Sequence, residues 1–519
     1  MDEKKIKFNW KYFLWIALAV FLLRLPTFYQ HIIDIDETVF SEFAKVILSG
    51  GLPYVDVVDN KPPLTYFFFA VVYFLTGSYS LIAVHIVTAI WVFVTALFVF
   101  FTAKKFAPEK AAFAGTIAFI LLMHTYEPKY ISTNGETLIN LPLIASCYLF
   151  LFYGTNFRGI ILHVISGFLL GLAILTNYKS AVVAILYVIY TLIAIFFFYK
   201  GEGVKIKQLL IKLFITGVAS FVPIIAMSLF FYKKGIFDDA LFWGFLYNFG
   251  YIESGTASGS VSKIFFRSIY FVLLGFPVWL CIATGFLKEF IKSSRWKEIE
   301  RERMELFVFF ICWLLLSFYA ATLGGRGYGH YFIQIVPPLS LLGAFFYEHF
   351  AFKKFFWLWI ALPVFILTLS RVDMLKSYEL INYPNYRSEI SYKRVGEFIK
   401  NNSSFNDKIY VWGWATPVYY FADRRPASRF IISDFVSGRV FGTDNKSDAK
   451  RKNFAGKFLP ILCDDLRKNK PKFIADTSPS GYFGYDRFPI SEFIELDEFI
   501  KKNYEKFAEI DKIVIYKLK

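Results

Sequence analysis

The sequence of 519 residues has little charge and little cysteine. Charged residues make up only 19% of it, whereas hydrophobic residues make up 56% and the mean hydropathy is +0.47. A soluble globular protein of this length needs far more polar surface, so the composition excludes that class and indicates a polytopic membrane protein. The four cysteines, three of them in apolar runs, are too few for a disulfide framework.

Short motifs that mark several enzyme classes are also missing. The sequence has no glycine pattern for nucleotide binding, no nucleophile elbow and no His and Cys spacing for a metal site, so no metal ligand is predicted. The apolar run after Trp10 lacks a small-residue cleavage site, and we interpret it as a retained membrane span. The net charge of +16 lies mostly beside apolar runs, which favours contact with membrane lipids over nucleic acid.

The density of charge divides the chain near Ser370. Residues 371–519 contain 47 Asp, Glu, Lys and Arg in 149 positions, against 51 in residues 1–370. Apolar runs of spanning length fill the first part, and we predict eleven spans. They lie near residues 12–29, 80–103, 110–126, 136–153, 159–176, 180–199, 208–231, 264–287, 306–323, 331–349 and 355–371. The run 64–77 is shorter than the ~20 residues of a span, so we interpret it as an interfacial or re-entrant helix.

Residues 371–519 have the pattern of a small α/β domain. Four β-rich runs predict strands: "KIYVWGW", "RFIISDF", "KFIADTS" and "KIVIYKL". Two amphipathic runs predict helices: "SYKRVGEFIKNN" and "KFLPILCDDLRKN".

The basic residues predict the orientation of the spans. The short basic start "MDEKKIKFNWK" favours a cytoplasmic N-terminus, and counting eleven spans then places the other basic loops on the same side. The outer face of the plasma (inner) membrane receives a first outer loop of residues 30–79, the segments "EPKYISTNGE", "TNYKS" and "GGRGYGH", and residues 371–519. The unusual polar motifs are therefore predicted to gather on one face.

Acidic residues open the first outer loop, where Asp34, Asp36 and Glu37 lie within four positions. Like charges this close raise one another's pKa, so the cluster suits a base or a ligand for hydroxyls or a cation. A plain interfacial carboxylate is the simpler interpretation of any one of them. Glu136 in "STNGETL" is either a favourable helix-start acid or a second acidic member of the site.

Cationic and aromatic residues are predicted on the same face. Two prolines follow Lys61 in "NKPPL", so this lysine either begins a helix or is held rigidly at the membrane surface for a phosphate. Lys179 either snorkels or contacts a phosphate. Arg326, His330 and Tyr331 lie in a glycine-rich loop that allows close approach. Together these residues predict a site for an anionic lipid-linked substrate.

The order of four segments carries a resemblance to a known family. "DIDETVFSEFAKVILSGG" with "NKPPL", then "STNGETL", "GFLLGLAILTNYKS" and "GGRGYGHYFIQIVPP" resemble the GT-C glycosyltransferases of the dolichyl-phosphate-mannose protein mannosyltransferase type. The branch that includes the lipid A aminoarabinose transferases is the most similar. The resemblance covers about residues 10–370, and "IYVWGWATPVYYFADRRPASRF" is similar to the outer domain of that branch.

This resemblance implies a mainly α GT-C fold and an enzyme. Its donor would be a sugar on polyprenyl phosphate, and a glycan, lipid or protein acceptor would attack the anomeric carbon, usually with inversion. Catalytic acidic positions would fall on Asp36, Glu37 and Glu136. Contacts to the donor phosphate would fall on Lys61, Lys179 and Arg326, and a loop closing over the site would contain His330 and Tyr331. The segment "TNYKS" departs from the family, whose members often carry the lysine directly after the threonine.

Two other classes of protein remain as alternatives. A transporter or flippase for a lipid-linked glycan would have internal repeats and charges at mid-membrane depth, whereas the charges here lie at span ends. A non-catalytic membrane scaffold would not need acids and bases on one face. No cofactor beyond the donor is expected, and the sequence names neither the sugar, the acceptor nor a metal requirement.

Overall fold

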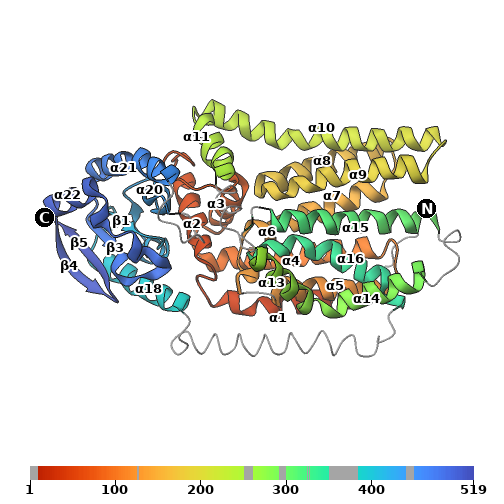
Figure 1. The fold of residues 1–519 in the computed structure, drawn as a ribbon, viewed down its shortest axis with the longest axis horizontal. Coiled ribbons are helices and arrows are strands. Elements are labelled where there is room, and N and C mark those ends of the chain that lie inside the picture. Colours follow the sequence, from red (N-terminus) through yellow and green to blue (C-terminus); the bar gives the residue numbers. More distant parts are fainter. Residues whose placement is uncertain are drawn as a thin grey trace.

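The structure, a computed structural model, describes residues 10–125, 128–250, 261–291, 300–323, 325, 328–349, 384–439 and 449–519. Most of the chain forms a bundle of long helices, and residues 384–519 form a small α/β domain at one end of it (Figure 1). We call these residues the tail domain. Helices α2 (Ile35–Leu48), α3 (Pro63–Thr76) and α11 (Phe237–Leu241) lie between the bundle and the tail domain (Figure 1).

The bundle contains the helices expected of a polytopic membrane protein. Within the described residues, eight are long and apolar enough to cross a membrane, and a ninth span results if one bent helix pair is counted as a single span. The eight are α1 with η1 (Trp10–Phe28), α4 (Leu81–Ala103), α6 with α7 (Gly135–Phe152), α8 (Phe157–Thr176), η3 with α9 and η4 (Tyr178–Phe198), α10 (Gly203–Lys233), α15 (Arg301–Thr322) and η8 with α16 and η9 (Gly329–His349).

These eight helices match eight of the eleven predicted spans. The prediction at 264–287 is a broken pair instead, because Ile264–Leu274 of α13 and Phe276–Glu289 meet at 80°. Helix α5 (Glu109–Thr125) occupies the predicted span 110–126 with 17 residues. The predicted span 355–371 and the predicted boundary near Ser370 lie outside the described residues. The run 64–77 is a short apolar helix, α3, as predicted.

Small residues allow two of the long helices to pack closely. Gly167 and Gly171 of α8 are four positions apart and so lie on one helix face. A Cβ atom at either position would collide with a backbone carbonyl of α10, that of Thr216 or that of Ser220. This is the small-xxx-small pattern by which helices associate in membranes, where van der Waals packing replaces the hydrophobic effect.

The tail domain is built on a five-stranded sheet with the order β2-β1-β3-β5-β4. Its strands are β1 (Lys408–Trp412), β2 (Arg425–Pro426), β3 (Phe473–Asp476), β4 (Tyr504–Ile510) and β5 (Ile513–Leu518). Strands β1, β2 and β3 are parallel, and β5 is antiparallel to β3 and β4. Helices α18 (Pro384–Asn401), α19 (Pro417–Ala422), α20 (Asp434–Ser437), α21 (Ala449–Asn469) and α22 (Ile494–Asn503) complete it.

The tail domain confirms three predicted strands and both predicted helices, but the prediction of a strand at "RFIISDF" is wrong. Residues 429–433 form an irregular segment that leads into α20. Phe430 and Ile431 are buried there because the segment packs between the sheet and the membrane part. Burial of both side chains accounts for the apolar run that the sequence offered as a strand.

The tail domain and the end of the bundle that faces it share one hydrophobic core. Val39 and Phe43 of α2 belong to the same buried cluster as Tyr410 of the tail domain sheet. Polar contacts join the two parts as well. The hydroxyl oxygens of Thr38 and Thr416 are 2.6 Å apart, and the N–H of Val58 donates to the carbonyl of Arg429 at 2.9 Å. The tail domain is therefore fixed against α2.

Candidate active site

The start of α2 is fixed by its own acidic residues. The Asp34 carboxylate accepts a hydrogen bond from the backbone N–H of Asp36 at 3.0 Å. Glu37 accepts from the backbone N–H groups of Ile33 and Asp34 at 2.9 and 3.2 Å. This capping box satisfies N–H groups that a helix start otherwise leaves unpaired. Two of the three acids therefore position the third, Asp36.

Glu37 also connects α2 to two other segments. Its Oε1 atom lies 3.0 Å from His85 Nε2 on α4 and accepts from the N–H of Thr133 at 2.7 Å. His85 Nδ1 lies 2.8 Å from the carbonyl oxygen of Thr27, so both ring nitrogens face acceptors. Burial alone would raise the pKa of Glu37, but His85 and the N–H donors lower it below its ordinary value. The carboxylate of Glu37 is turned into the fold and is 1% exposed.

Asp36 lies between two lysines. Lys129 Nζ is 2.9 Å from one oxygen of Asp36 and 3.0 Å from Asp34, and Lys61 Nζ is 4.0 Å from the other oxygen of Asp36. Burial alone would raise the pKa of Asp36, but Lys129 and Lys61 lower it well below its ordinary value. Burial raises the pKa of Asp34 to about 6, against the opposing effect of Lys129. The predicted rise in pKa thus applies to Asp34 and not to Asp36.

The "NKPPL" turn is braced around its lysine. Lys61 Nζ lies 3.1 Å from Asp59 Oδ2, which also accepts from the Tyr66 hydroxyl at 2.9 Å. The Tyr54 hydroxyl donates to the carbonyl of Lys61 at 2.7 Å. Pro63 is the first residue of α3. The same turn therefore begins a helix and fixes the position of Lys61. The Lys61 side chain is 33% exposed, which leaves it open to a ligand.

A helical segment that follows η5 holds the same turn through a pair of amides. The Asn60 side chain donates to Asn248 Oδ1 at 3.1 Å, and Asn248 Nδ2 donates to the carbonyl of Asn60 at 2.7 Å. Asn248 follows η5 (Phe242–Leu246) and lies 188 positions from Asn60 along the chain. The residue before Lys61 is therefore fixed by the segment that follows α11.

Lys179 reaches the same end of the bundle from η3 (Tyr178–Ala181). Its Nζ atom has no hydrogen-bond partner among the described residues and lies 2.7 Å from the centre of the Tyr331 ring. Glu136 is buried and interacts electrostatically with Lys179. Helix α6 is capped by Asn134, which accepts from the N–H of Thr137 at 2.8 Å, so Glu136 is not the capping residue.

His330 lies where the charged groups meet. It is in η8 (Gly329–Ile335), and its ring lies 5.8 Å from that of Tyr328 at an interplanar angle of 14°. The Tyr130 hydroxyl, next to Lys129, donates to the carbonyl of Gly329 at 2.6 Å and ties the two loops together. Four charged side chains interact electrostatically with His330: Asp36, Lys61, Lys129 and Lys179.

The structure thus brings most of the predicted site residues to the end of the bundle that faces the tail domain. Those that meet there are Asp36, Lys61, Glu136, Lys179, His330 and Tyr331. Glu37 lies beside them but points inward, and Arg326 is outside the described residues. No group of three or more His, Cys, Asp and Glu residues in the described part of the chain is arranged to hold a metal ion.

Sequence reasoning missed two charged residues of this site, Lys129 and Asp59. Both stand in segments that the span count placed on the outer face, "EPKYISTNGE" and "DVVDNKPPL". A lysine in a loop that otherwise carries acids was the available signal for Lys129. Asp59 lies two positions before Lys61, a spacing that allows the ion pair in an extended turn.

The helical bundle, the loops at one end of it and the docked α/β domain are the architecture of a polytopic membrane protein. Residues 60–227, about a third of the chain, match the model of the family described as dolichyl-phosphate-mannose-protein mannosyltransferase. The match contains Lys61, Glu136 and Lys179 and leaves Asp36 outside. No curated protein sequence matches the chain at a significant level.

Solved structures with little sequence identity have the same fold. ArnT from Cupriavidus metallidurans, bound to undecaprenyl phosphate, matches with a TM-score of 0.62 at 13% identity, over 97% of this chain and 97% of that one. The archaeal oligosaccharyltransferase AglB from Archaeoglobus fulgidus, in complex with an inhibitory peptide and a dolichol phosphate, matches with a TM-score of 0.54 at 12% identity, over 96% of this chain and 73% of that one. The predicted GT-C fold and the predicted resemblance are confirmed.

Proposed function

We propose that this protein is a membrane glycosyltransferase that moves a sugar from a polyprenyl-phosphate donor to a glycan, lipid or protein acceptor on the outer face of the membrane. The observation that carries the proposal is Asp36 held between Lys61 and Lys129 at the end of the bundle. Such a site combines an ionised carboxylate for the nucleophile with ammonium groups for a phosphate. The family match and the fold support this class of reaction.

Lys61 and Lys129 would bind the phosphate of the donor. Burial alone would lower the pKa of each lysine, but the neighbouring aspartates raise it above the ordinary value, so both are charged at neutral pH. As the bond from the anomeric carbon to the phosphate oxygen breaks, negative charge builds on that oxygen. Two fixed ammonium groups stabilise this charge in the transition state. Lys179 lies nearby, and its Nζ atom has no hydrogen-bond partner among the described residues.

Asp36 would act on the acceptor. With two lysines beside it, its carboxylate has a lowered pKa and is a weak base. A donor phosphate on Lys61 and Lys129 competes with Asp36 for these ammonium groups, and the pKa of Asp36 then rises. The base is therefore strongest when donor is present, and it can take the proton of the acceptor hydroxyl or amine during attack. Attack from the face opposite the leaving phosphate inverts the anomeric carbon.

Neighbouring residues would position these groups. Glu37 orders the start of α2 through the capping box and the contact to His85, so we assign it a positioning role. Glu136 would hold Lys179 in the site by charge. His330 and Tyr331 would cover the bound donor from η8, where the ring of Tyr331 lies against the Lys179 ammonium.

Turnover by the purified chain tests the proposal. The protein is mixed with a polyprenyl-phosphate sugar and with extracted envelope glycan and lipid, and release of free polyprenyl phosphate is measured together with the sugar gained by the acceptor. We expect both products in equal amounts. Movement of the intact donor across vesicles without release of polyprenyl phosphate would favour the flippase alternative instead. Loss of one modified glycan or lipid in a deletion strain would identify the acceptor.

A further inference from the structure

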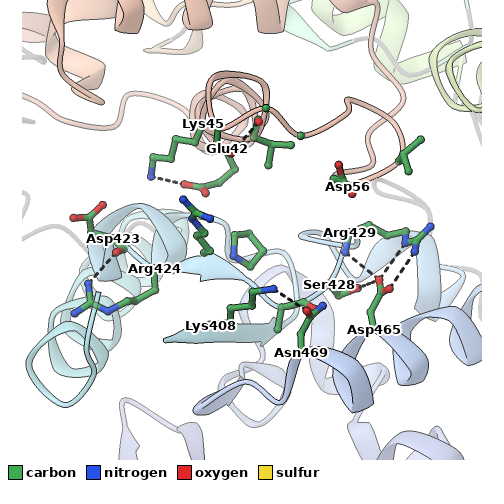
Figure 2. A pocket seen from close by; sticks show the side chains of 18 of the residues that line it. Glu42, Lys45, Asp56, Lys408, Asp423, Arg424, Ser428, Arg429, Asp465 and Asn469 are labelled. Atoms are coloured by element: carbon green, nitrogen blue, oxygen red, sulfur yellow. Dashed lines mark hydrogen bonds and ion pairs between the residues drawn. The ribbon is translucent and has the colours of Figure 1, made fainter. Parts of the chain in front are cut away.

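A cleft lies between α2 and the tail domain (Figure 2). Its volume is about 620 Å³, within the range of ligand-binding pockets. One wall is the second half of α2, including Lys45, and the other is the tail domain at the starts of β1 and β2 and the end of α21. Nine positions separate Asp36 and Lys45, about 13 Å and two and a half turns, so the two residues point to opposite sides of the helix.

Several charged residues of the cleft form ion pairs or hydrogen bonds with other residues of the protein. Arg429 forms a two-bond contact to Asp465, with both distances at 3.1 Å (Figure 2). Lys45 Nζ lies 2.7 Å from Glu42 (Figure 2). The Arg424 guanidinium donates to backbone carbonyls and is 8% exposed. These groups build the walls and are not available to a ligand without loss of their partners.

Three other cations line the tail domain wall and have no acidic partner among the described residues. Arg425 and Lys468 are exposed, and within the described part of the chain neither side chain makes a hydrogen bond or an ion pair. Among the described residues, the one hydrogen-bond partner of Lys408 Nζ is the amide oxygen of Asn469, at 2.7 Å (Figure 2). The three come from β2, α21 and β1, so the fold gathers them from separate segments. The two further acids of the cleft have partners of their own, since Asp56 accepts from the N–H of Leu52 at 2.7 Å and Asp423 lies 3.9 Å from Lys400. Cations gathered in a concave site favour an anionic ligand.

Aromatic side chains stand in the same cleft. Tyr79 is 49% exposed and Phe405 is 66% exposed, although both are large and apolar. Tyr79 comes from the loop before α4 and Phe405 from the tail domain, so they contribute from both walls. Exposed aromatic rings offer flat apolar faces on which the C–H faces of sugar rings stack. Asn469 and Ser428 add uncharged hydrogen-bonding groups.

From this combination we propose that the cleft is a binding site for an anionic glycan, whose carboxylate or phosphate groups contact Arg425, Lys408 and Lys468 while its rings stack on Tyr79 and Phe405. The glycan can be free or carried on a lipid, since the recognised groups are the same. On the proposed function, this site would hold an acceptor glycan away from its reacting end and select acceptors by charge.

Binding of a defined trisaccharide tests the site in the full-length chain. The probe is trigalacturonate, which carries three carboxylates, and the neutral comparison is maltotriose. Calorimetric titrations use protein in phosphatidylcholine nanodiscs at about 0.05 M and about 0.5 M NaCl. We expect trigalacturonate to bind more tightly than maltotriose, with an affinity that falls at the higher salt. The double variant R425A/K468A should weaken this binding about tenfold or more, because it removes two charge-assisted contacts.

The control double variant is R394A/K501A, which removes an exposed arginine and an exposed lysine of the tail domain outside the cleft. It should bind as the parent does. Equal binding of the two trisaccharides, or unchanged binding in R425A/K468A, overturns the proposal. If phosphatidylglycerol nanodiscs block the trisaccharide, the cleft takes lipid headgroups and the glycan assignment fails. Lys61→Ala should leave trisaccharide binding in the cleft intact. The binding proposal and the proposed transfer reaction are therefore tested independently of each other.

Discussion

The protonation state of Asp36 is set by its neighbours. Lys61 and Lys129 keep it ionised although its side chain is largely buried. Without them, burial would favour the protonated acid. The sequence predicted Asp36 and Lys61 as separate halves of a site, and the structure shows them 4.0 Å apart. Lys129, which links them, comes from a segment 93 positions away along the chain, and its pairing with Asp36 was not predicted.

Replacing Asp36 tests the base. Asp36→Asn keeps the shape of the side chain and removes its capacity to take a proton, so we expect sugar transfer to fall by roughly 10²-fold or more. Turnover of purified protein at a saturating concentration of donor is the measurement. Asp238→Asn, an exposed residue of α11, is the control and should leave transfer unchanged. Near-normal turnover in Asp36→Asn would remove Asp36 from the reaction.

Replacing Lys61 tests the phosphate contact. Lys61→Ala should weaken donor binding and slow transfer, since one of the two ammonium groups at the leaving phosphate is lost. Lys61→Arg should be intermediate, because the planar guanidinium keeps the charge but not the compact shape of lysine. Donor affinity and turnover are measured together, with the exposed Lys233→Ala as control. If Lys61→Ala binds and reacts like the parent, this lysine serves only the start of α3.

Asp34 should make the stability of the protein depend on pH. Its pKa is raised to about 6 in the fold, from an ordinary value of 3.8. An acid whose pKa is raised on folding contributes stability in its protonated form, so this contribution is complete below about pH 4 and is lost as the pH rises through 6. Asp34→Asn keeps a helix-capping side chain without the charge.

We therefore expect Asp34→Asn to raise the apparent melting temperature by a few degrees at pH 7.5 and to have little effect near pH 4. Thermal unfolding in detergent, followed at several pH values, is the measurement. The same gain at every pH would show that the ionisation of Asp34 is not the cause. A loss of stability at pH 7.5 would show that its ion pair with Lys129 outweighs the burial of its charge.

At the scale of elements, the segment after η5 supports the lysine turn through Asn248. Asn248→Ala removes both hydrogen bonds to Asn60, each worth on the order of 1 kcal/mol, so we expect the KM for donor to rise about fivefold with a smaller change in kcat. The double variant with Lys61→Ala is the decisive control. If Asn248 acts through Lys61, its replacement adds no further loss in that background. Full additivity would contradict the positioning role.

Elements were predictable from sequence where periodicity or apolar length decided them. The long spans and the short helix α3 follow from the length of their apolar runs, and β1, β3 and β5 from β-rich composition. The segment 429–433 was misread because the tail domain buries it against the membrane part, which gives a loop the composition of a strand. Strand β4 was missed because its residues are mostly exposed and include Glu505, Lys506 and Glu509.

At the scale of the whole molecule, orientation in the membrane is the open prediction. We expect the tail domain outside and the loop before α15 inside, because the basic loops alternate with the spans. Single cysteines at Lys393 and Arg301, both half-exposed positions, can be labelled in intact cells with an impermeant reagent. Three of the four native cysteines are buried, so background labelling is limited to Cys312. Labelling at 301 with protection at 393 would invert the orientation.

The common core of the tail domain and the outer helices has a consequence for protein engineering. Val39 and Phe43 of α2 belong to that core, while Asp36 stands one turn earlier on the same helix. A chimaera that joins this bundle to the tail domain of a relative would leave the apolar face of α2 without its complementary surface. The exchange would then have to include residues 30–79 as part of the grafted unit. In this protein, the domain to be transplanted is not continuous in sequence.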